Sequence, residues 1–143
     1  MKNMKYRKGL LFILIAAEIV LSAYLAYTKI TGTKAFCLTG QGCETVQNSA
    51  YGTILGIPLG VVGIASFSAL FVLYLLVYNN KLPNYLFLIA TIIGAIGSLY
   101  FLSLQVFVIG AICSDCFIVD CTMLIIAGIT IYDYYKTKSI NRW

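Results

Sequence analysis

Four long apolar runs constrain this chain more than any other feature. Residues 10–27 contain a single charge, Glu18, and residues 54–78 and 85–112 contain none, while the last run carries Asp115 and Asp120. A transmembrane helix needs roughly 20 apolar residues, and a chain with 61% apolar and 10% charged residues is not a typical soluble domain. We expect one all-α domain over residues 1–143, a four-helix transmembrane bundle with spans near 10–27, 54–78, 85–105 and 113–134.

The third run is too long for one span, because its 28 residues would extend about 42 Å as a helix. Gly110 is a plausible helix stop. We therefore place a turn between Gln105 and Ile112, so that the last helix begins close to Cys113 at a membrane surface. The loop 28–53 should share that surface.

The cations are distributed unequally between the two ends of this bundle. Eight lie at the termini and in the second loop (Lys2, Lys5, Arg7, Lys8, Lys81, Lys136, Lys138 and Arg142), whereas the other side has Lys29 and Lys34. The positive-inside rule then places both termini in the cytoplasm. A signal peptide is the alternative interpretation of the N-terminus, but no A-x-A cleavage site follows the run. The charges anchor the chain in a lipid bilayer, and no pattern predicts a nucleic-acid partner.

Cysteine carries the concentrated chemistry of the chain, since histidine is absent. Cys37 and Cys43 lie in the outer loop, and Cys113 and Cys116 form a C-x-x-C motif at the outer end of the last span. Two pairs that face one oxidising compartment can exchange disulfides, and thiolate zinc sites are not expected there, so we predict no metal. Cys121, flanked by apolar residues, is expected to pack.

The C-x-x-C spacing has a chemical rationale. A thiol at a helix start lies near unpaired backbone N–H groups and the positive end of the helix dipole, which stabilise a thiolate. The second cysteine, one turn deeper, can resolve a mixed disulfide. A redox relay through Cys37, Cys43, Cys113 and Cys116 is the favoured hypothesis. The alternative is a non-enzymatic four-helix membrane protein in which two inert disulfides brace the outer face.

At these residues the sequence resembles the vitamin K epoxide reductase family in its compact bacterial form. The matching pattern, in order, is Cys37-x5-Cys43, Val46, Ser49, Tyr51-Gly52, Gly56-Ile57-Pro58 and Cys113-x-x-Cys116. The thiol oxidase DsbB has the reverse order, with its C-x-x-C motif first. The resemblance therefore favours the vitamin K epoxide reductase family over DsbB.

The resemblance implies a quinone-dependent thiol oxidoreductase of the bacterial plasma membrane that supports disulfide bond formation. It would reoxidise a DsbA-like thioredoxin-fold partner and reduce a membrane quinone, menaquinone or ubiquinone. By motif position, Cys37 would meet the partner, Cys43 would exchange with Cys113, and Cys116 would lie beside the quinone. Ser49 matches a loop hydroxyl that lies near the quinone in the family. The resemblance also implies that residues 44–50 form a short helix that caps the bundle and covers the quinone site.

Asp120 departs from the pattern of animal members, which carry Tyr at this position. A protonated carboxyl there could donate a hydrogen bond or a proton to the quinone, which favours quinone reduction over epoxide reduction. Two other polar residues lie in apolar surroundings. Glu18 is interpreted as a carboxyl hydrogen-bonded to Ser98, Ser103 or a backbone carbonyl, with a proton relay as the alternative. Gln105 is expected to contact headgroups, or alternatively the quinone.

Overall fold

Four membrane-length helices dominate the computed structural model, which describes residues 2–38 and 40–140. These helices are α1 (Lys2–Thr31), α3 (Leu59–Tyr78), α4 (Asn84–Ser103) and α5 (Ser114–Ile140). Within the described ranges, four segments are long and apolar enough to cross a bilayer: Tyr6–Thr31, Leu59–Tyr78, Asn84–Ile109 and Ser114–Thr137. The predicted all-α membrane bundle is confirmed.

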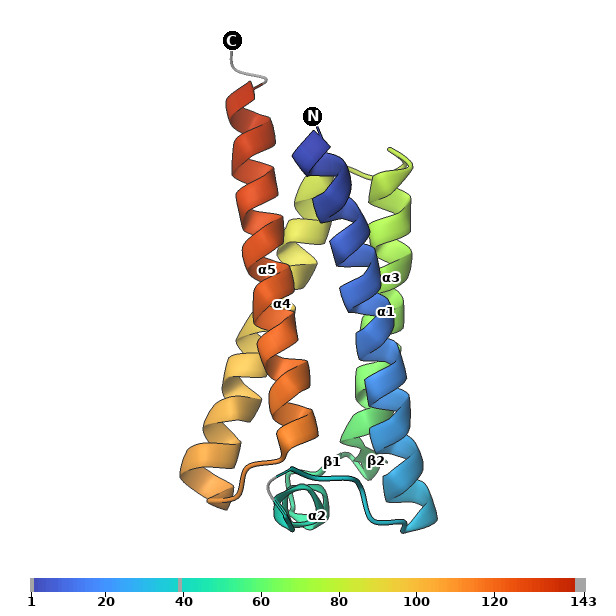
Figure 1. Ribbon diagram of the computed structural model, residues 1–143, viewed down its shortest axis with the longest axis vertical. Helices are drawn as coiled ribbons and strands as arrows, with labels where there is room; N and C mark the ends of the chain where they lie inside the picture. The colour runs from blue at the N-terminus through green and yellow to red at the C-terminus, as the bar shows by residue number, and fades with distance from the viewer. Residues whose placement is uncertain (1, 39, 141–143) are drawn as a thin grey trace.

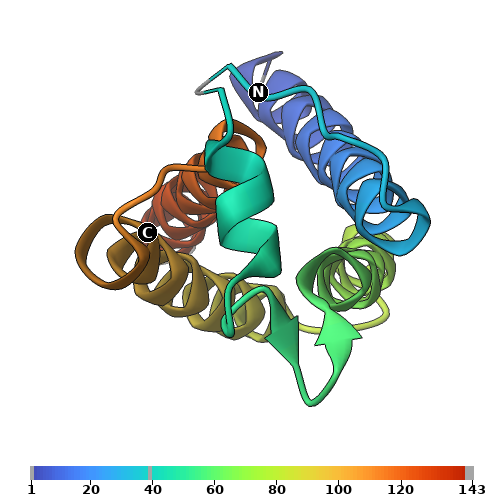
Figure 2. The ribbon, with the colours of Figure 1, turned by 90° about the horizontal axis from the view of Figure 1, so that it is seen from below.

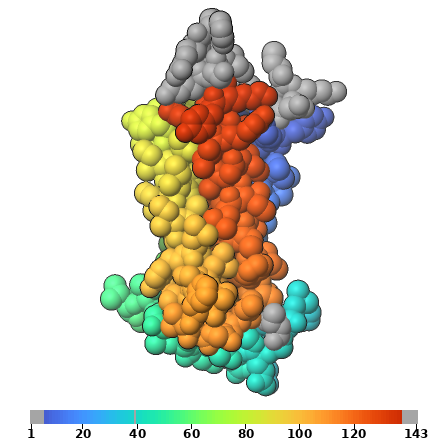
Figure 3. Space-filling model, turned by 90° about the vertical axis from the view of Figure 1, so that its left-hand side faces the viewer, coloured from blue at the N-terminus to red at the C-terminus, as the bar shows by residue number. Residues whose placement is uncertain are grey.

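The helices stand side by side, with the small elements gathered at one end (Figure 1). The start of α1 and the end of α5 lie at the upper end of the view, and the short helix α2 (Gly42–Asn48) lies at the lower end. Seen from below, α2 lies across the bundle (Figure 2). Figure 3 shows α4 and α5 against each other, with the segment that contains α2 closing the lower end. This segment is the cap that we expected at 44–50, beginning two residues earlier.

The second span begins later than hydropathy predicts. Residues 54–58 belong to a small antiparallel hairpin, in which β1 (Thr53–Ile54) pairs with β2 (Ile57–Pro58). Its turn residues, Leu55 and Gly56, have φ values of 53° and 81°, which are left-handed conformations incompatible with a continuous helix. The prediction of a span from residue 54 is therefore wrong at its start, because an apolar turn has the same hydropathy as an apolar helix.

The turn before Cys113 lies where the sequence predicts it. After α4 the chain continues as a π-helical stretch, η1 (Leu104–Ile109), and stops at Gly110 with φ 66°. Glycine adopts this left-handed conformation without a Cβ clash. The π-helical turn is wider than an α-helical one, and it leaves Leu104 and Gln105 buried inside the bundle.

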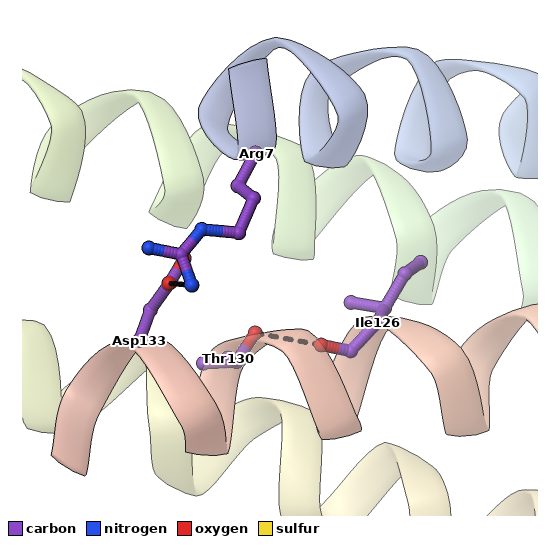
Figure 4. Close-up of polar contacts among 4 residues, drawn as sticks. All are labelled: Arg7, Ile126, Thr130 and Asp133. Carbon is purple, nitrogen blue, oxygen red and sulfur yellow. Dashed lines mark hydrogen bonds and ion pairs between the residues drawn. The ribbon is translucent and has the colours of Figure 1, made fainter. Parts of the chain in front are cut away.

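Close packing and a polar clasp join the helices. Gly60 of α3 meets the α1 backbone so closely that a Cβ would lie 2.5 Å from the Ala26 nitrogen. At the opposite end of α1, Arg7 pairs with Asp133 of α5 at 2.8 Å between Nη1 and Oδ1 (Figure 4). One turn earlier on α5, the Thr130 hydroxyl donates to the carbonyl oxygen of Ile126 at 2.8 Å. The polar clasp therefore lies at the end of the bundle that carries the chain termini.

Two contacts from α1 hold the cap in place. The Lys29 ammonium donates to the Gln47 carbonyl oxygen and to Asn48 Oδ1, both at 2.8 Å. Five residues earlier on α1, the Tyr24 hydroxyl accepts the backbone N–H of Phe36 at 2.8 Å. The first contact fixes the end of α2 and the second fixes the loop immediately before Cys37.

Candidate functional site

Cys37 and Cys43 form a disulfide with a Cα–Cα separation of 5.9 Å. Cys43 is in the first turn of α2 and is 1% exposed, whereas Cys37 is half-buried in the preceding loop. The backbone N–H of Cys43 donates to Cys37 Sγ at 3.2 Å. The pair therefore presents its first sulfur toward the surface and buries its second.

Cys113 and Cys116 lie at the start of α5 and are thiols, as is Cys121. The carbonyl of Cys113 accepts the N–H of Phe117 at 2.8 Å, which makes Cys113 the residue that opens the helix. Its own N–H donates to Gln105 Oε1 at 3.0 Å, and its sulfur accepts the N–H of Cys116 at 3.3 Å. Backbone and side-chain partners thus fix Cys113 fully inside the protein.

The two pairs meet in one buried cluster. Cys43, Val46 and Cys113 form its centre, and Cys37 and Cys116 pack against it. The four cysteines that the sequence singles out are therefore brought together, although 70 residues separate Cys43 from Cys113. Ser114, for which the sequence predicts no role, follows Cys113 directly and contacts the outer pair, since its hydroxyl is 3.5 Å from Cys37 Sγ and 3.7 Å from Cys43 Sγ.

The environment of Cys113 favours its thiolate. The hydrogen bond from the Cys116 side chain lowers the pKa of Cys113 below the ordinary value of a thiol, and the Cys116 backbone N–H acts in the same direction. Burial opposes this effect, because a charged sulfur loses hydration. The hydrogen bonds prevail, so the pKa of Cys113 lies below the ordinary value of a thiol.

A cavity of about 440 Å³ extends from this cluster between the helices. Its wall is mainly apolar, with residues from α1, α3, α4 and α5, and its size matches that of small-molecule sites. Among its polar lining residues are Cys116, Asp120, Gln105, Gln47 and Tyr51. Two site residues from the sequence analysis, Cys116 and Asp120, thus line one cavity.

Gln105 connects the cavity to the thiols, which corrects the headgroup interpretation. It is 4% exposed, and its Nε2 donates to Asp120 Oδ2 at 3.4 Å while its Oε1 accepts from Cys113. The Ser98 side chain is a further hydrogen-bonding neighbour of Asp120. The amide therefore links the carboxyl in the cavity to the backbone of the buried thiol.

Glu18 is buried, as predicted, but with another neighbour than those predicted. It is 2% exposed, and its carboxyl has Thr122 of α5 as its hydrogen-bonding neighbour. Its Oε2 has no partner within the part of the chain that the structure describes. Ser103 instead donates to the carbonyl of Tyr100 at 2.6 Å. Sequence spacing does not identify which residue of another helix lies beside this carboxyl.

Ser49 is not among the residues that line the cavity. It caps the end of α2, and its hydroxyl donates to the Val46 carbonyl at 2.7 Å. The neighbouring Gln47 and Tyr51 line the cavity instead. Within the described ranges, no group of three or more histidine, cysteine or acidic residues is arranged to hold a metal ion.

The fold and site define a class: a four-helix membrane protein with two cysteine pairs at one end and an apolar cavity beside the inner pair. The family model for the vitamin K epoxide reductase family matches residues 9–131. The chain belongs to this family.

A curated relative is the thiol-disulfide oxidoreductase LTO1 of Arabidopsis thaliana, which is 40% identical over 63 residues. The match covers 43% of this chain and 17% of LTO1. The chain thus matches only a small part of that longer protein. Family membership and this similarity together support disulfide oxidoreductase activity in a membrane.

Proposed function

We propose that this protein is a membrane thiol oxidoreductase that reoxidises a DsbA-like thioredoxin-fold partner and passes the electrons to a membrane quinone. The observation that carries the proposal is the burial of Cys43 and Cys113 in one cluster, with Cys116 on the wall of an apolar cavity. Cys37, Cys43, Cys113 and Cys116 are its catalytic residues. All four belong to the single domain proposed for residues 1–143.

Electrons from the partner enter at Cys37. This sulfur is half-buried, and its neighbours Phe36 and Leu38 are 73% and 76% exposed. Exposed apolar side chains on both sides of a reactive cysteine suit contact with another protein. The partner's thiolate attacks Cys37 Sγ, and the electron pair of the broken bond leaves on Cys43.

Cys43 then transfers the electrons to the inner pair. Its thiolate attacks Cys113 Sγ of a Cys113–Cys116 disulfide, and Cys116 leaves with the electron pair. The second thiolate of the partner attacks the partner's sulfur in the mixed disulfide, which oxidises the partner and releases Cys37 as a thiolate. Cys37 then attacks Cys43 and expels Cys113. The lowered pKa of Cys113 makes it a good leaving group. The state with a Cys37–Cys43 disulfide and thiols at Cys113 and Cys116 is the product of this exchange.

The cavity fits the head group of a quinone, because it is apolar over most of its wall and carries polar side chains beside Cys116. A quinone, menaquinone or ubiquinone, would accept the two electrons and two protons that leave the dithiol. Asp120 and Gln105 supply polar groups at this wall. Ser49 remains a further proposed contact, which requires its hydroxyl to turn away from Val46.

The cation distribution sets the proposed orientation in a bacterial plasma membrane. The start of α1, which contains Arg7, and the connection between α3 and α4, which contains Lys81, lie at the end of the bundle that holds the termini (Figure 1). We assign this end to the cytoplasm. Lys29 and Lys34 belong to the opposite end, together with both cysteine pairs. The pairs would then face the oxidising compartment in which disulfides persist.

The test is oxidation of a reduced thioredoxin-fold protein by the purified protein, with and without added quinone. We expect turnover only with quinone, its loss in Cys116→Ser, and loss of exchange with the partner in Cys37→Ser. Cys121→Ser is the matched control and should retain wild-type turnover. A wild-type protein that leaves its partner reduced in the presence of both quinones would contradict the proposal.

The alternative, a protein braced by inert disulfides, predicts a different thiol pattern. Alkylation followed by a gel shift, after addition of the reduced partner, counts the cysteines that change state. The relay predicts that reducing equivalents appear at Cys113 and Cys116 and disappear on addition of quinone. If Cys37, Cys43, Cys113 and Cys116 all stayed in one state throughout, the brace would be favoured.

A further inference from the structure

The hydroxyl of Ser114 lies against both sulfurs of the outer disulfide. It donates to Cys37 Sγ at 3.5 Å and is 3.7 Å from Cys43 Sγ. Ser114 is 8% exposed and is the first residue of α5, immediately after Cys113. A side chain of the inner motif is therefore in contact with the reacting atoms of the outer pair.

The oxygen of this hydroxyl is held by another partner. The backbone N–H of Leu38 donates to Ser114 Oγ at 3.1 Å. With the oxygen engaged as an acceptor, its single proton remains available to a sulfur, and acceptance of one hydrogen bond strengthens donation of the next. Because a hydroxyl proton rotates about its C–O bond, one serine can serve either sulfur in turn.

We propose that Ser114 is a further catalytic residue, which donates its hydrogen bond to whichever sulfur of the Cys37–Cys43 pair carries negative charge. When an external thiolate attacks Cys37 Sγ, the Cys37–Cys43 bond breaks and the electron pair leaves on Cys43, where Ser114 stabilises it. When the mixed disulfide at Cys37 is then resolved, the electron pair leaves on Cys37. This sulfur then accepts hydrogen bonds from the Ser114 hydroxyl and from the backbone N–H of Cys43.

This inference rests on the proposed function for its physiological meaning, but its chemistry can be measured without quinone or a protein partner. Stabilising the thiolate products makes a disulfide easier to reduce, both in rate and at equilibrium. Ser114 should therefore make the outer pair a better electron acceptor.

The experiment measures reduction of the Cys37–Cys43 disulfide by dithiothreitol, in the purified full chain, by quenching, alkylation and mass mapping. In Ser114→Ala we expect reduction to slow about tenfold. The equilibrium with glutathione should also move about tenfold toward the disulfide, which corresponds to about 30 mV. Ser114→Thr, which keeps the hydroxyl, should recover most of the rate.

If Ser114 had a purely structural role, its removal would change the reduction rate in the opposite direction. Without Ser114 Oγ the loop at Leu38 loses an anchor, and a loosened loop would expose the disulfide and speed its reduction. Ser103→Ala is the matched control, because its exposed hydroxyl donates to the carbonyl of Tyr100 in its own helix.

Reduction of Ser114→Ala at the wild-type rate or faster would overturn the inference. If Ser114→Ala fails to fold, equal reduction rates for Ser114→Val and Ser114→Thr, which are nearly isosteric, would overturn it as well. Failure of the proposed function is distinguishable, because it would abolish quinone-dependent turnover in the wild type and leave the effect on dithiothreitol reduction in place.

Discussion

Gln105 Oε1 accepts the backbone N–H of Cys113 at 3.0 Å, across the turn that joins the third and fourth spans. The same amide reaches Asp120 Oδ2 through Nε2. One side chain thus fixes the backbone of the buried thiol and orients the carboxyl that lines the cavity. The π-helical stretch η1 is what places it inside the bundle.

Replacement of Gln105 should impair the inner half of the relay. Gln105→Leu leaves the buried N–H of Cys113 without an acceptor, which costs about 1–3 kcal/mol. We expect quinone-dependent turnover to fall at least about tenfold, with the rate of dithiothreitol reduction at Cys37–Cys43 unchanged. Stopped-flow assays of both reactions check this, with Gln41→Leu on the exposed surface of the cap as the control. Equal losses in both reactions would contradict it.

Alkylation of Cys113 should depend on pH in a way that reports its partner. The Cys116 side chain lowers the pKa of Cys113, so its thiolate persists to lower pH than that of an ordinary cysteine. In Cys116→Ala this hydrogen bond is lost, and the midpoint of the alkylation rate should move to higher pH. Rates measured with a small alkylating reagent from pH 5 to 10 test the direction. An unchanged midpoint would show that Cys116 does not stabilise the thiolate.

Gly60 should tolerate no side chain. A Cβ at this position meets the backbone of Ala26 at 2.5 Å, so Gly60→Ala must push α1 and α3 apart, at a cost of about 1–3 kcal/mol. Gly97→Ala is the matched control, since a Cβ there has no neighbour within 4 Å and alanine favours the helix. Thermal unfolding in detergent should show a lower Tm for the first variant only.

The clasp between Arg7 and Asp133 should contribute to stability and not to catalysis. Their side chains are 21% and 22% exposed, and the guanidinium also lies over the Tyr132 ring at 4.9 Å. A double-mutant cycle with Arg7→Met and Asp133→Asn should give a coupling of about 1 kcal/mol. Turnover per folded molecule should be unchanged, because the clasp lies at the end of the bundle opposite the cysteines.

Hydropathy was sufficient to locate the four spans, because apolar length depends on the chain alone. The stop at Gly110 was also predictable, since glycine readily adopts a left-handed conformation. The hairpin at Thr53–Pro58 was not, because its apolar residues continue the pattern of the following helix. The residue that indicates this turn in the sequence is Gly56, which lies immediately before Ile57-Pro58.

The identity of the site's cysteines could be predicted from the sequence, whereas most contacts between the site residues could not. The spacing and sidedness of the cysteines predicted that both pairs lie at one end of the bundle, but not that they are buried together. The roles of Ser114 and Gln105 depend on hydrogen-bond partners in other elements. Ser114 occupies a variable position inside the C-x-x-C motif, and Gln105 was interpreted as interfacial. Only the packed structure shows that each side chain connects two elements.

The hydrogen bond from the Phe36 backbone N–H to the Tyr24 hydroxyl anchors the loop before Cys37 to α1. This anchor helps to hold the outer cysteines beside the inner ones. Cys37 follows the anchored residue Phe36 directly, and Cys43 is six residues further along the chain. Because the short loop is held in place, each cysteine pair experiences the other at a very high effective concentration. In the proposed relay, exchange between the pairs would then be a first-order event that does not depend on dilution. Collision with the partner would be the only step of the outer half-reaction whose rate depends on protein concentration. More copies of the protein in the membrane would therefore raise the rate of partner oxidation only by making this collision more frequent.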